Sequence, residues 1–483
     1  MAWKLSGTDA GWHRATGIPG SMRGSREGAG VQWLQETRDQ GEIVRQYTKV
    51  DHRLEHQDNP GFMVSRLLQV AMSEPRGPVY MAVPQETACL PLPGTARFPT
   101  RDDLGVARQV GPDPDDARTI ARWLVDATNP CVYTSRVGRD PAAVQELVRL
   151  AELLAIPVMV DASADRMNFP ADSPLYGTGP ASHEADVLLL FEHLSPYSPG
   201  RGSPSRDAKI AWVSIDPVLS RFKTIEYRAD LWIPASSAAV ARAVHEAASH
   251  LLTNSARTRI AARRERLERR KRELDDQAEA LAQADLGAGK LNGRVTAYEL
   301  GKLLEPEAIV LNDGLSTGPG PLVSTYARRS RPGTYFRSGS SSGGWGAGAA
   351  FGVKLARPEH DVILTSGDGY FTFGSPMPAL WAARAHGSAF LSVVFVNQTY
   401  STGTAALARM YPEGHAAGGG FVGGRFDPAP RFDKLAEVVD GYGEHVRELS
   451  QLGPALRRGL EHARQNTPAV IAVEVPPPVQ LSH

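Results

Sequence analysis

The stretch from Asp361 to Gly403 reads DVILTSGDGYFTFGSPMPALWAARAHGSAFLSVVFVNQTYSTG and decides the fold of the second half of the chain. A first apolar run ends in Gly-Asp-Gly at 367–369, and a second apolar run covers 390–396. The segment between them has helical spacing, with Ser375 as the expected N-cap and Gly387 as the expected stop. Strand, helix and strand in this order predict two parallel neighbours joined by one crossover.

Oxygen-bearing residues follow both predicted strands. Asp368 stands at the end of the first strand and Asn397 at the end of the second. A magnesium ion takes about six oxygen ligands, usually with only one or two carboxylates, and phosphate and water complete the shell. The Asp368 carboxylate, the Asn397 amide oxygen and the Thr399 backbone carbonyl are candidate metal ligands. Gly367 and Gly369 permit a tight turn and a close approach of backbone to a phosphate group.

A Gly-Asp-Gly tripeptide alone is usually only a turn, but its distance from Asn397 is informative. Asn397 lies 29 positions after Asp368, which resembles the thiamine-diphosphate signature of acetolactate synthases, benzoylformate decarboxylases and their relatives. The doubled Asn common in that signature is Val396-Asn397 here, and the resemblance carries the ligand role to the second position. It implies thiamine diphosphate and Mg²⁺ as cofactors.

Two further segments resemble parts of the same family. Residues 335–348 are similar to its glycine-rich helix start, and this similarity implies cofactor contacts by Ser342, Gly343 and Gly344. The alternative is a helix start whose glycines only allow close packing. Asn312 and Gly314 follow an apolar run at 308–311, where the relatives have a polar loop near the diphosphate.

Segments typical of strands and helices alternate over most of the chain, which predicts an α/β fold with doubly wound parallel sheets. Four parts are expected: an arm and the remnant of a pyrimidine-binding domain at 1–95, a central Rossmann-like domain at 110–255, a connecting helix at 256–288, and a diphosphate-binding domain at 289–483. Apolar spacing predicts helices at 33–50, 61–72, 115–127 and 142–154, and Arg and Glu residues at helical spacing predict a solvated helix at 254–284. Apolar spacing predicts strands at 79–83, 130–134, 157–160, 187–191 and 210–215.

The N-terminal part looks incomplete beside the family. There the pyrimidine-binding domain begins about a hundred residues before a strand like 79–83, and it contains a glutamate that activates the cofactor. Glu27, Glu36 and Glu42 do not follow an early strand, so we assign that role to no glutamate of this chain. We expect a small subunit to supply it, with a homodimer of this chain inside a heterotetramer. A truncated chain and a non-catalytic or regulatory thiamine-diphosphate-binding homologue are the alternatives.

Composition and motifs argue against several other classes of function. Lys and Arg together number 53, as do Asp and Glu, so no overall field favours nucleic acid. No run approaches the roughly 18 apolar residues of a membrane span, and a cytoplasmic protein is expected. The two cysteines, Cys89 and Cys131, lack metal or redox spacing. The central domain has no GxGxxG after its first strand, which speaks against a flavin or nicotinamide oxidoreductase.

The resemblance therefore implies a decarboxylase or carboligase that depends on thiamine diphosphate and magnesium and acts on a 2-oxo acid such as pyruvate. Phe373, Met377, Tyr400 and Leu407 are candidate pocket residues, with ordinary core positions as the alternative. Leu315 and Trp345 are candidates for the apolar side chain that supports the bent cofactor.

Overall fold

The computed structural model describes residues 39–477 apart from 56–57, 85–86, 89–90, 93, 95, 101–102, 163, 198–201, 223–225, 315–318, 339–342 and 427. The chain divides into two compact units, Met1–Val110 and Gly111–His483. In the described part, no helix is both long enough and apolar enough to cross a membrane.

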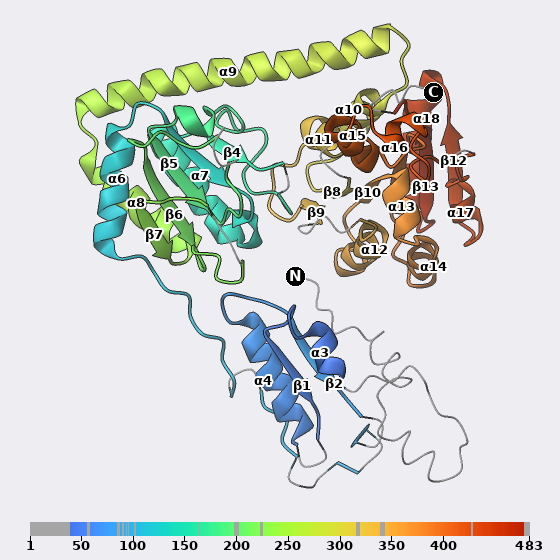
Figure 1. The fold of residues 1–483 in the computed structure, drawn as a ribbon, viewed down its shortest axis with the longest axis horizontal. Coiled ribbons are helices and arrows are strands. Elements are labelled where there is room, and N and C mark those ends of the chain that lie inside the picture. The colour runs from blue at the N-terminus through green and yellow to red at the C-terminus, as the bar shows by residue number, and fades with distance from the viewer. Residues whose placement is uncertain are drawn as a thin grey trace. The chain divides into compact units, whose positions relative to one another are not determined.

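The first unit contains a small parallel sheet of two strands, β1 (Val50–Arg53) and β2 (Val79–Ala82), with helices α3 (Gln40–Val44) and α4 (Pro60–Met72) (Figure 1). Asn59 caps α4 by accepting the N–H of Phe62. The helix predicted at 33–50 is wrong beyond Val44. The strand at Val50 is held by pairing with residues far along the chain, and helical spacing in a local window does not report such pairing.

The second unit begins with a sheet of five parallel strands in the order β4-β3-β5-β6-β7. The predicted strands at 130–134 and 187–191 are confirmed without change, and the helices predicted at 115–127 and 142–154 are confirmed to within a residue or two. The elements are α6 (Pro114–Asp126), β3 (Pro130–Thr134), α7 (Pro141–Leu154), β4 (Val158–Val160), β5 (Val187–Phe191), β6 (Lys209–Ser214), β7 (Leu231–Pro234) and α8 (Ser237–Leu251).

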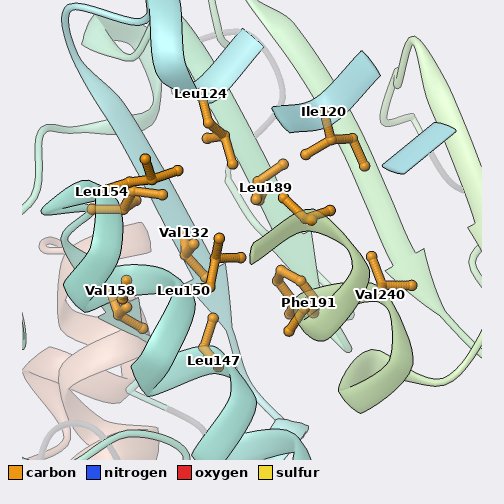
Figure 2. Close-up of a cluster of buried hydrophobic side chains, with 14 of the residues drawn as sticks. Ile120, Leu124, Val132, Leu147, Leu150, Leu154, Val158, Leu189, Phe191 and Val240 are labelled. Carbon is orange, nitrogen blue, oxygen red and sulfur yellow. The ribbon is translucent and has the colours of Figure 1, made fainter. Parts of the chain in front are cut away.

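A large apolar core forms where α6, α7 and α8 pack on one face of this sheet. Figure 2 shows its centre, with Leu124 and Leu150 from helices meeting Val132 and Leu189 from strands. The opposite face carries Trp212 of β6 and Trp232 of β7 and packs against loop side chains such as Tyr227. All five residues of β5 are buried, as expected for the middle strand of a parallel sheet.

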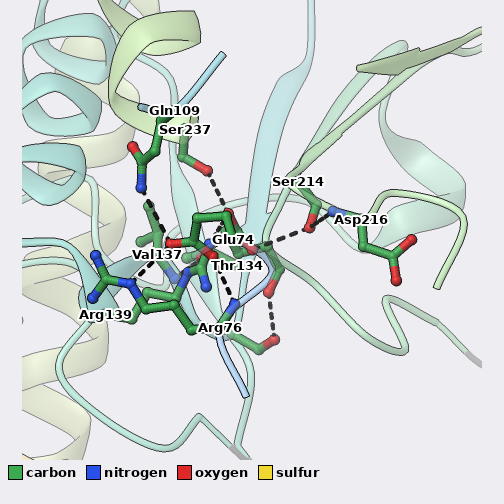
Figure 3. Close-up of polar contacts among 12 residues, drawn as sticks. Glu74, Arg76, Gln109, Thr134, Val137, Arg139, Ser214, Asp216 and Ser237 are labelled. Carbon is green, nitrogen blue, oxygen red and sulfur yellow. Dashed lines mark hydrogen bonds and ion pairs between the residues drawn. The ribbon is translucent and has the colours of Figure 1, made fainter. Parts of the chain in front are cut away.

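A buried carboxylate organises the carboxyl edge of the same sheet. Glu192 directly follows β5 with a positive φ of 47°. Its side chain accepts hydrogen bonds from Ser214 and Ser237, both at 3.1 Å, and pairs with Arg139 at 3.2 Å. Figure 3 labels these three partners. Three donors from three segments satisfy the charge, so this cluster has a structural role.

The long helix α9 (Asn254–Gly287) confirms the helix predicted at 254–284 and follows the five-stranded sheet. Its Arg263 is only 4% exposed. The guanidinium donates to the carbonyl oxygens of Ala127, Leu154 and Ala155 at 2.9, 2.6 and 3.0 Å. These carbonyls stand at the ends of α6 and α7, where no partner exists within the helix. Arg263 therefore fixes α9 to the ends of both helices.

The rest of the second unit contains a sheet of six parallel strands in the order β12-β13-β11-β10-β8-β9. Its strands are β8 (Ile309–Asp313), β9 (Tyr335–Arg337), β10 (Val362–Gly367), β11 (Leu391–Val396), β12 (Tyr442–Val446) and β13 (Ala469–Glu474). On one face lie α10 (Gly293–Gly301), α11 (Pro319–Tyr326) and α18 (Leu449–Arg464). On the other lie α12 (Gly346–Ala356), α13 (Asp368–Phe373), α14 (Met377–Ala385) and α17 (Lys434–Glu437).

The deciding stretch folds largely as predicted. β10 and β11 are parallel neighbours, with Gly367 opposite Phe395, and Gly387 ends the crossover helix with a φ of 63°. Two details differ. The short helix α13 starts directly at Asp368, and α14 has Pro376 as its N-cap, whereas Ser375 forms a turn with a φ of 46°. The additional turn at 374–375 separates the two helices and moves the start of α14 by one residue.

Candidate functional site

The carboxylate of Asp368 lies between the ends of β10 and β11 and is only 2% exposed. Its Oδ1 accepts the N–H of Gly369 at 2.8 Å, and its Oδ2 accepts the N–H of Gln398 at 2.6 Å. The second bond spans from one strand end to the loop after the neighbouring strand. Asp368 thus holds that loop in place while each carboxylate oxygen retains further capacity to accept.

Burial raises the pKa of Asp368 to about 6, although the N–H groups of Gln398 and Gly369 act in the opposite direction. No ion pair reaches this carboxylate from the residues that the structure describes. A buried carboxylate without a cationic partner is costly in its charged form. A divalent cation at this position would supply the missing charge.

Asn397 and Thr399 lie in the loop that Asp368 holds. Asn397 Oδ1 accepts the N–H of Thr399 at 3.0 Å and its hydroxyl at 3.3 Å, which is a local turn of the kind that Asn favours. Residue Gln398 between them has a φ of 61°. The turn fixes the Asn397 amide oxygen and the Thr399 carbonyl at the carboxyl edge of the sheet, as the sequence predicts for two of the candidate ligands.

A second loop packs on this one. The N–H of Tyr400 donates to Gly424 O at 2.9 Å, and the N–H of Phe426 donates to Gln398 O at 2.8 Å. The rings of Tyr400 and Phe426 meet edge to face at 4.5 Å. The sequence gives no local signal for this support, because the two loops are distant in the chain.

The glycines divide into two groups. A Cβ at Gly369 would stand 2.8 Å from the Tyr400 ring, and one at Gly344, whose φ is 83°, would stand 2.4 Å from Gly374 Cα. One at Gly343 would stand 3.0 Å from the Tyr370 ring. Close packing therefore explains these three positions. A Cβ at Gly367 would meet no atom within 4 Å, so this strand end has open space beside it.

Asn312 and Asp313, at the end of β8, bring buried polar atoms to the same edge. Asn312 Nδ2 donates to Gly320 O at 3.0 Å and to the Tyr335 hydroxyl at 2.9 Å, while its Oδ1 has no partner. Asp313 Oδ2 accepts the N–H of Gly346 at 3.3 Å, and its Oδ1 likewise has no partner. Burial raises the pKa of Asp313 to about 6.

Sequence reasoning selected Asn312 and Gly314 and missed Asp313. The signal was present, because Asp313 ends an apolar strand as Asp368 does. Asp313 lies opposite Ser366 of β10, two residues before Asp368. The two carboxylates therefore end adjacent strands of one sheet.

Other candidate residues have varied positions. Ser342, Leu315, Glu27, Glu36 and Cys89 lie outside the described residues. Trp345 is partly buried, and its Nε1 has no partner. The four candidate pocket residues are not core, because their exposed fractions are 75% for Phe373, 43% for Met377, 41% for Tyr400 and 43% for Leu407.

The donor set fits a magnesium ion bound to a diphosphate better than a transition metal. Within the described residues, no three His, Cys, Asp or Glu side chains gather as a metal-binding group. The candidate site offers one carboxylate at Asp368, one amide oxygen at Asn397 and one carbonyl at Thr399. Mg²⁺ accepts such a sparse set of hard oxygens because phosphate and water complete its shell.

Comparisons with known proteins indicate thiamine diphosphate as the cofactor. Residues 319–473 match the family described as thiamine pyrophosphate enzyme, C-terminal TPP binding domain. The acetolactate synthase large subunit of Mycobacterium tuberculosis is 28% identical over 432 residues, which are 87% of this chain and 73% of that protein. The benzoylformate decarboxylase of Pseudomonas aeruginosa is 24% identical over 77% of this chain and 67% of its own length.

The fold has a close counterpart among solved structures. The benzoylformate decarboxylase of Polynucleobacter necessarius superimposes with a TM-score of 0.72 at 18% identity, covering 97% of this chain and 81% of that one. The α/β fold with several parallel sheets is thus confirmed. The chain is thus acetolactate synthase-like: it is similar to thiamine-diphosphate-dependent acetolactate synthases and benzoylformate decarboxylases, and its residues 319–473 match the C-terminal TPP binding domain of thiamine pyrophosphate enzymes.

Proposed function

We propose that this chain binds thiamine diphosphate with Mg²⁺ at the carboxyl ends of β8, β10 and β11 and catalyses decarboxylation or carboligation of a small 2-oxo acid. The observation that carries the proposal is the buried carboxylate of Asp368, which has backbone donors on both oxygens but no cationic partner among the described residues. The match of residues 319–473, which include β10 and β11, to a TPP binding domain supports a cofactor site in this part of the chain.

The bound cofactor would supply the nucleophilic carbon that adds to the 2-oxo acid and accepts the electron pair released with carbon dioxide. The residues of this chain bind and orient it. Asp368, Asn397 and Thr399 are the proposed metal ligands, and the open space at Gly367 is the proposed approach for the diphosphate. Gly343 and Gly344 contribute through close packing with Tyr370 and Gly374, which shapes the glycine-rich segment before α12.

We further propose that full activity requires a partner polypeptide that contributes the activating glutamate. In the first unit, apolar side chains of the helices and of the turn after α3 are exposed, including Ile43 at 62%, Tyr47 at 75% and Phe62 at 46%, and Val50 at the start of β1 is exposed at 39%. Parallel sheets are normally covered on both faces. Glu42 lies exposed in the first turn of α3. A relative described as a large subunit supports a small-subunit partner, and we propose a homodimer of this chain within that assembly.

Calorimetric titration tests the cofactor site. Thiamine diphosphate is titrated into the full chain with and without Mg²⁺, and then into Asp368→Asn. We expect metal-dependent binding to the unchanged chain and binding at least about tenfold weaker in the variant, since charged contacts contribute about 1.5–3 kcal/mol each. Asp361→Asn is the matched control, because Asp361 pairs with Arg464 outside the site. Equal binding by Asp368→Asn and the control would contradict the assignment.

A pyruvate decarboxylation assay tests the partner. The chain is measured alone and mixed with candidate small proteins that co-purify with it. Activity that appears only on mixing supports a shared active site, whereas full activity of the isolated chain rules out the partner requirement. Tight cofactor binding without turnover in every mixture would favour a non-catalytic cofactor-binding protein.

A further inference from the structure

A cavity of about 320 Å³ lies in the second unit, apart from the residues proposed to hold the cofactor. Its walls come from the segment after β4, from the middle of α9, and from α11 with the loop that follows. Backbone hydrogen bonds close one side, from Met167 N–H to Tyr335 O at 3.2 Å and from Arg337 N–H to Asp165 O at 2.7 Å. The volume falls in the range of small-molecule sites, roughly 300–1,000 Å³.

One part of the wall is apolar and aromatic. Phe169 and Met167 are almost fully buried, at 1% and 4% exposure, and they line the cavity together with Tyr176 and Leu274. Aromatic and aliphatic walls favour a ligand with a compact apolar body, because binding removes apolar area from water on both partners. This wall alone would accept a neutral ligand as well.

Charge on α9 and in the loop after α11 restricts the class of ligand. Lys271 pairs with Asp275 at 2.5 Å, and Arg328 pairs with the same carboxylate at 2.6 Å. Two cations thus share one anion at the cavity wall, and Lys271 is only 7% exposed. Excess positive charge in a partly desolvated place is costly unless an anion compensates it.

The other charged side chains at the cavity do not neutralise the excess positive charge of Lys271 and Arg328. Arg166 also lines the cavity, but both of its bonds go to the neighbouring Asp165 at 2.9 Å. Arg329 donates to the carbonyl oxygens of Glu305 and Ala308. The other lining carboxylate, Asp161, has buried His193 as a neighbour at 3.8 Å. The wall around Lys271 and Arg328 is therefore the place where an anion gains most.

We propose that this cavity is a second ligand site and that it takes a small organic monocarboxylate. The carboxylate would pair with Arg328 and Lys271, and the apolar body would pack against Phe169 and Tyr176. Charge-assisted hydrogen bonds from Arg or Lys to a carboxylate are stronger than neutral ones, which gives the site its preference for an acid over the corresponding amide. The proposal does not depend on the cofactor assignment.

Calorimetric titration of the full chain with cyclohexanecarboxylate tests the site. We expect saturable binding with a Kd of about 1 mM or tighter, and at least about tenfold weaker binding of cyclohexanecarboxamide, which has the same shape without the charge. Inorganic phosphate serves as a compact anion without an apolar body and should bind much more weakly. No thiamine diphosphate is present, so the result is independent of the proposed function.

Two variants locate the binding. Arg328→Met keeps most of the apolar stem of the side chain but removes its charge, and Leu274→Trp fills the cavity; each should weaken cyclohexanecarboxylate binding about tenfold or more. Arg464→Met is the matched control, since Arg464 is also paired with an aspartate but lies outside the cavity. Thermal unfolding checks that each variant folds. Absence of binding, equal binding of acid and amide, stronger binding of phosphate, or unchanged binding by both folded cavity variants would overturn the proposal.

Discussion

Asp368 Oδ2 accepts the backbone N–H of Gln398 at 2.6 Å, which joins the end of β10 to the loop after β11. The bond places a carboxylate and the Asn397-Thr399 turn at one edge of the sheet. Strand order alone would bring these residues near one another, but the hydrogen bond fixes which way the loop turns. A cofactor site at this edge would therefore be largely formed before the cofactor binds.

Alanine substitutions at Gly367 and Gly369, the two glycines beside Asp368, distinguish a glycine required for close packing from one that leaves space for a ligand. Gly369→Ala puts a Cβ 2.8 Å from the Tyr400 ring, so we expect a loss of stability of about 1–3 kcal/mol from overpacking. Gly367→Ala meets no protein atom within 4 Å and has a φ of −76°, so its stability should stay unchanged while thiamine diphosphate binding weakens. Denaturant unfolding and calorimetry on both variants check this. Unchanged cofactor binding by Gly367→Ala would exclude that space as the diphosphate approach.

The sequence predicted well which residues lie at the carboxyl ends of β10 and β11, because the signals for these strand ends are local. Gly-Asp-Gly after an apolar strand, and Asn after the next, suffice to place two residues at adjacent strand ends. The sequence did not predict β1, because this strand depends on the pairing of Val50 with Val79, 29 positions later. The bonds of Arg263 were not predicted for the same reason, since they join α9 to residues 108 to 136 positions earlier in the chain. The cavity beside Lys271 likewise depends on how α9 meets the segment after β4 and the loop after α11.

Arg263→Met should destabilise the protein strongly. The substitution keeps the apolar stem but leaves three buried carbonyl oxygens, of Ala127, Leu154 and Ala155, without their donor. We expect a loss of about 3 kcal/mol or more, because each buried carbonyl oxygen left without a donor costs about 1–3 kcal/mol. Denaturant unfolding measures it. The control is Arg269→Met on the exposed side of α9, which should change stability by less than about 0.5 kcal/mol; equal effects would contradict the capping role of Arg263.

Acid should destabilise the second unit through His193. Burial lowers the pKa of His193 to about 4, although Asp161 acts in the opposite direction. The unfolded chain therefore takes up a proton near pH 6.5 while the folded protein does not. Stability falls as the pH drops from about 6.5 to 4, by about 3 kcal/mol from this group.

Unfolding of His193→Gln measured between pH 4 and 7 checks this contribution. The variant lacks the titrating group, so the difference in stability between it and the unchanged protein should shrink or reverse toward pH 4. His415→Gln is the control, because His415 is exposed in the short helix α16 (His415–Gly418). A constant difference across this pH range would contradict the prediction.

Asp313 should show the opposite dependence on pH. Burial raises its pKa to about 6, so the folded protein holds a proton that the unfolded chain loses near 3.8. The cost of the charged carboxylate therefore grows between about pH 4 and 6 and is complete above pH 6, where it amounts to about 3 kcal/mol. Asp313→Asn keeps an oxygen that accepts the N–H of Gly346 and removes this cost, so the variant should be more stable than the unchanged protein at pH 7 and not at pH 4.

Denaturant unfolding at both pH values measures the two differences, with Asp361→Asn, at an exposed ion pair, as the control. A variant that is less stable at pH 7 would mean that the Asp313 charge is compensated within the folded protein, and its partner would then have to be sought at the unpaired Oδ1.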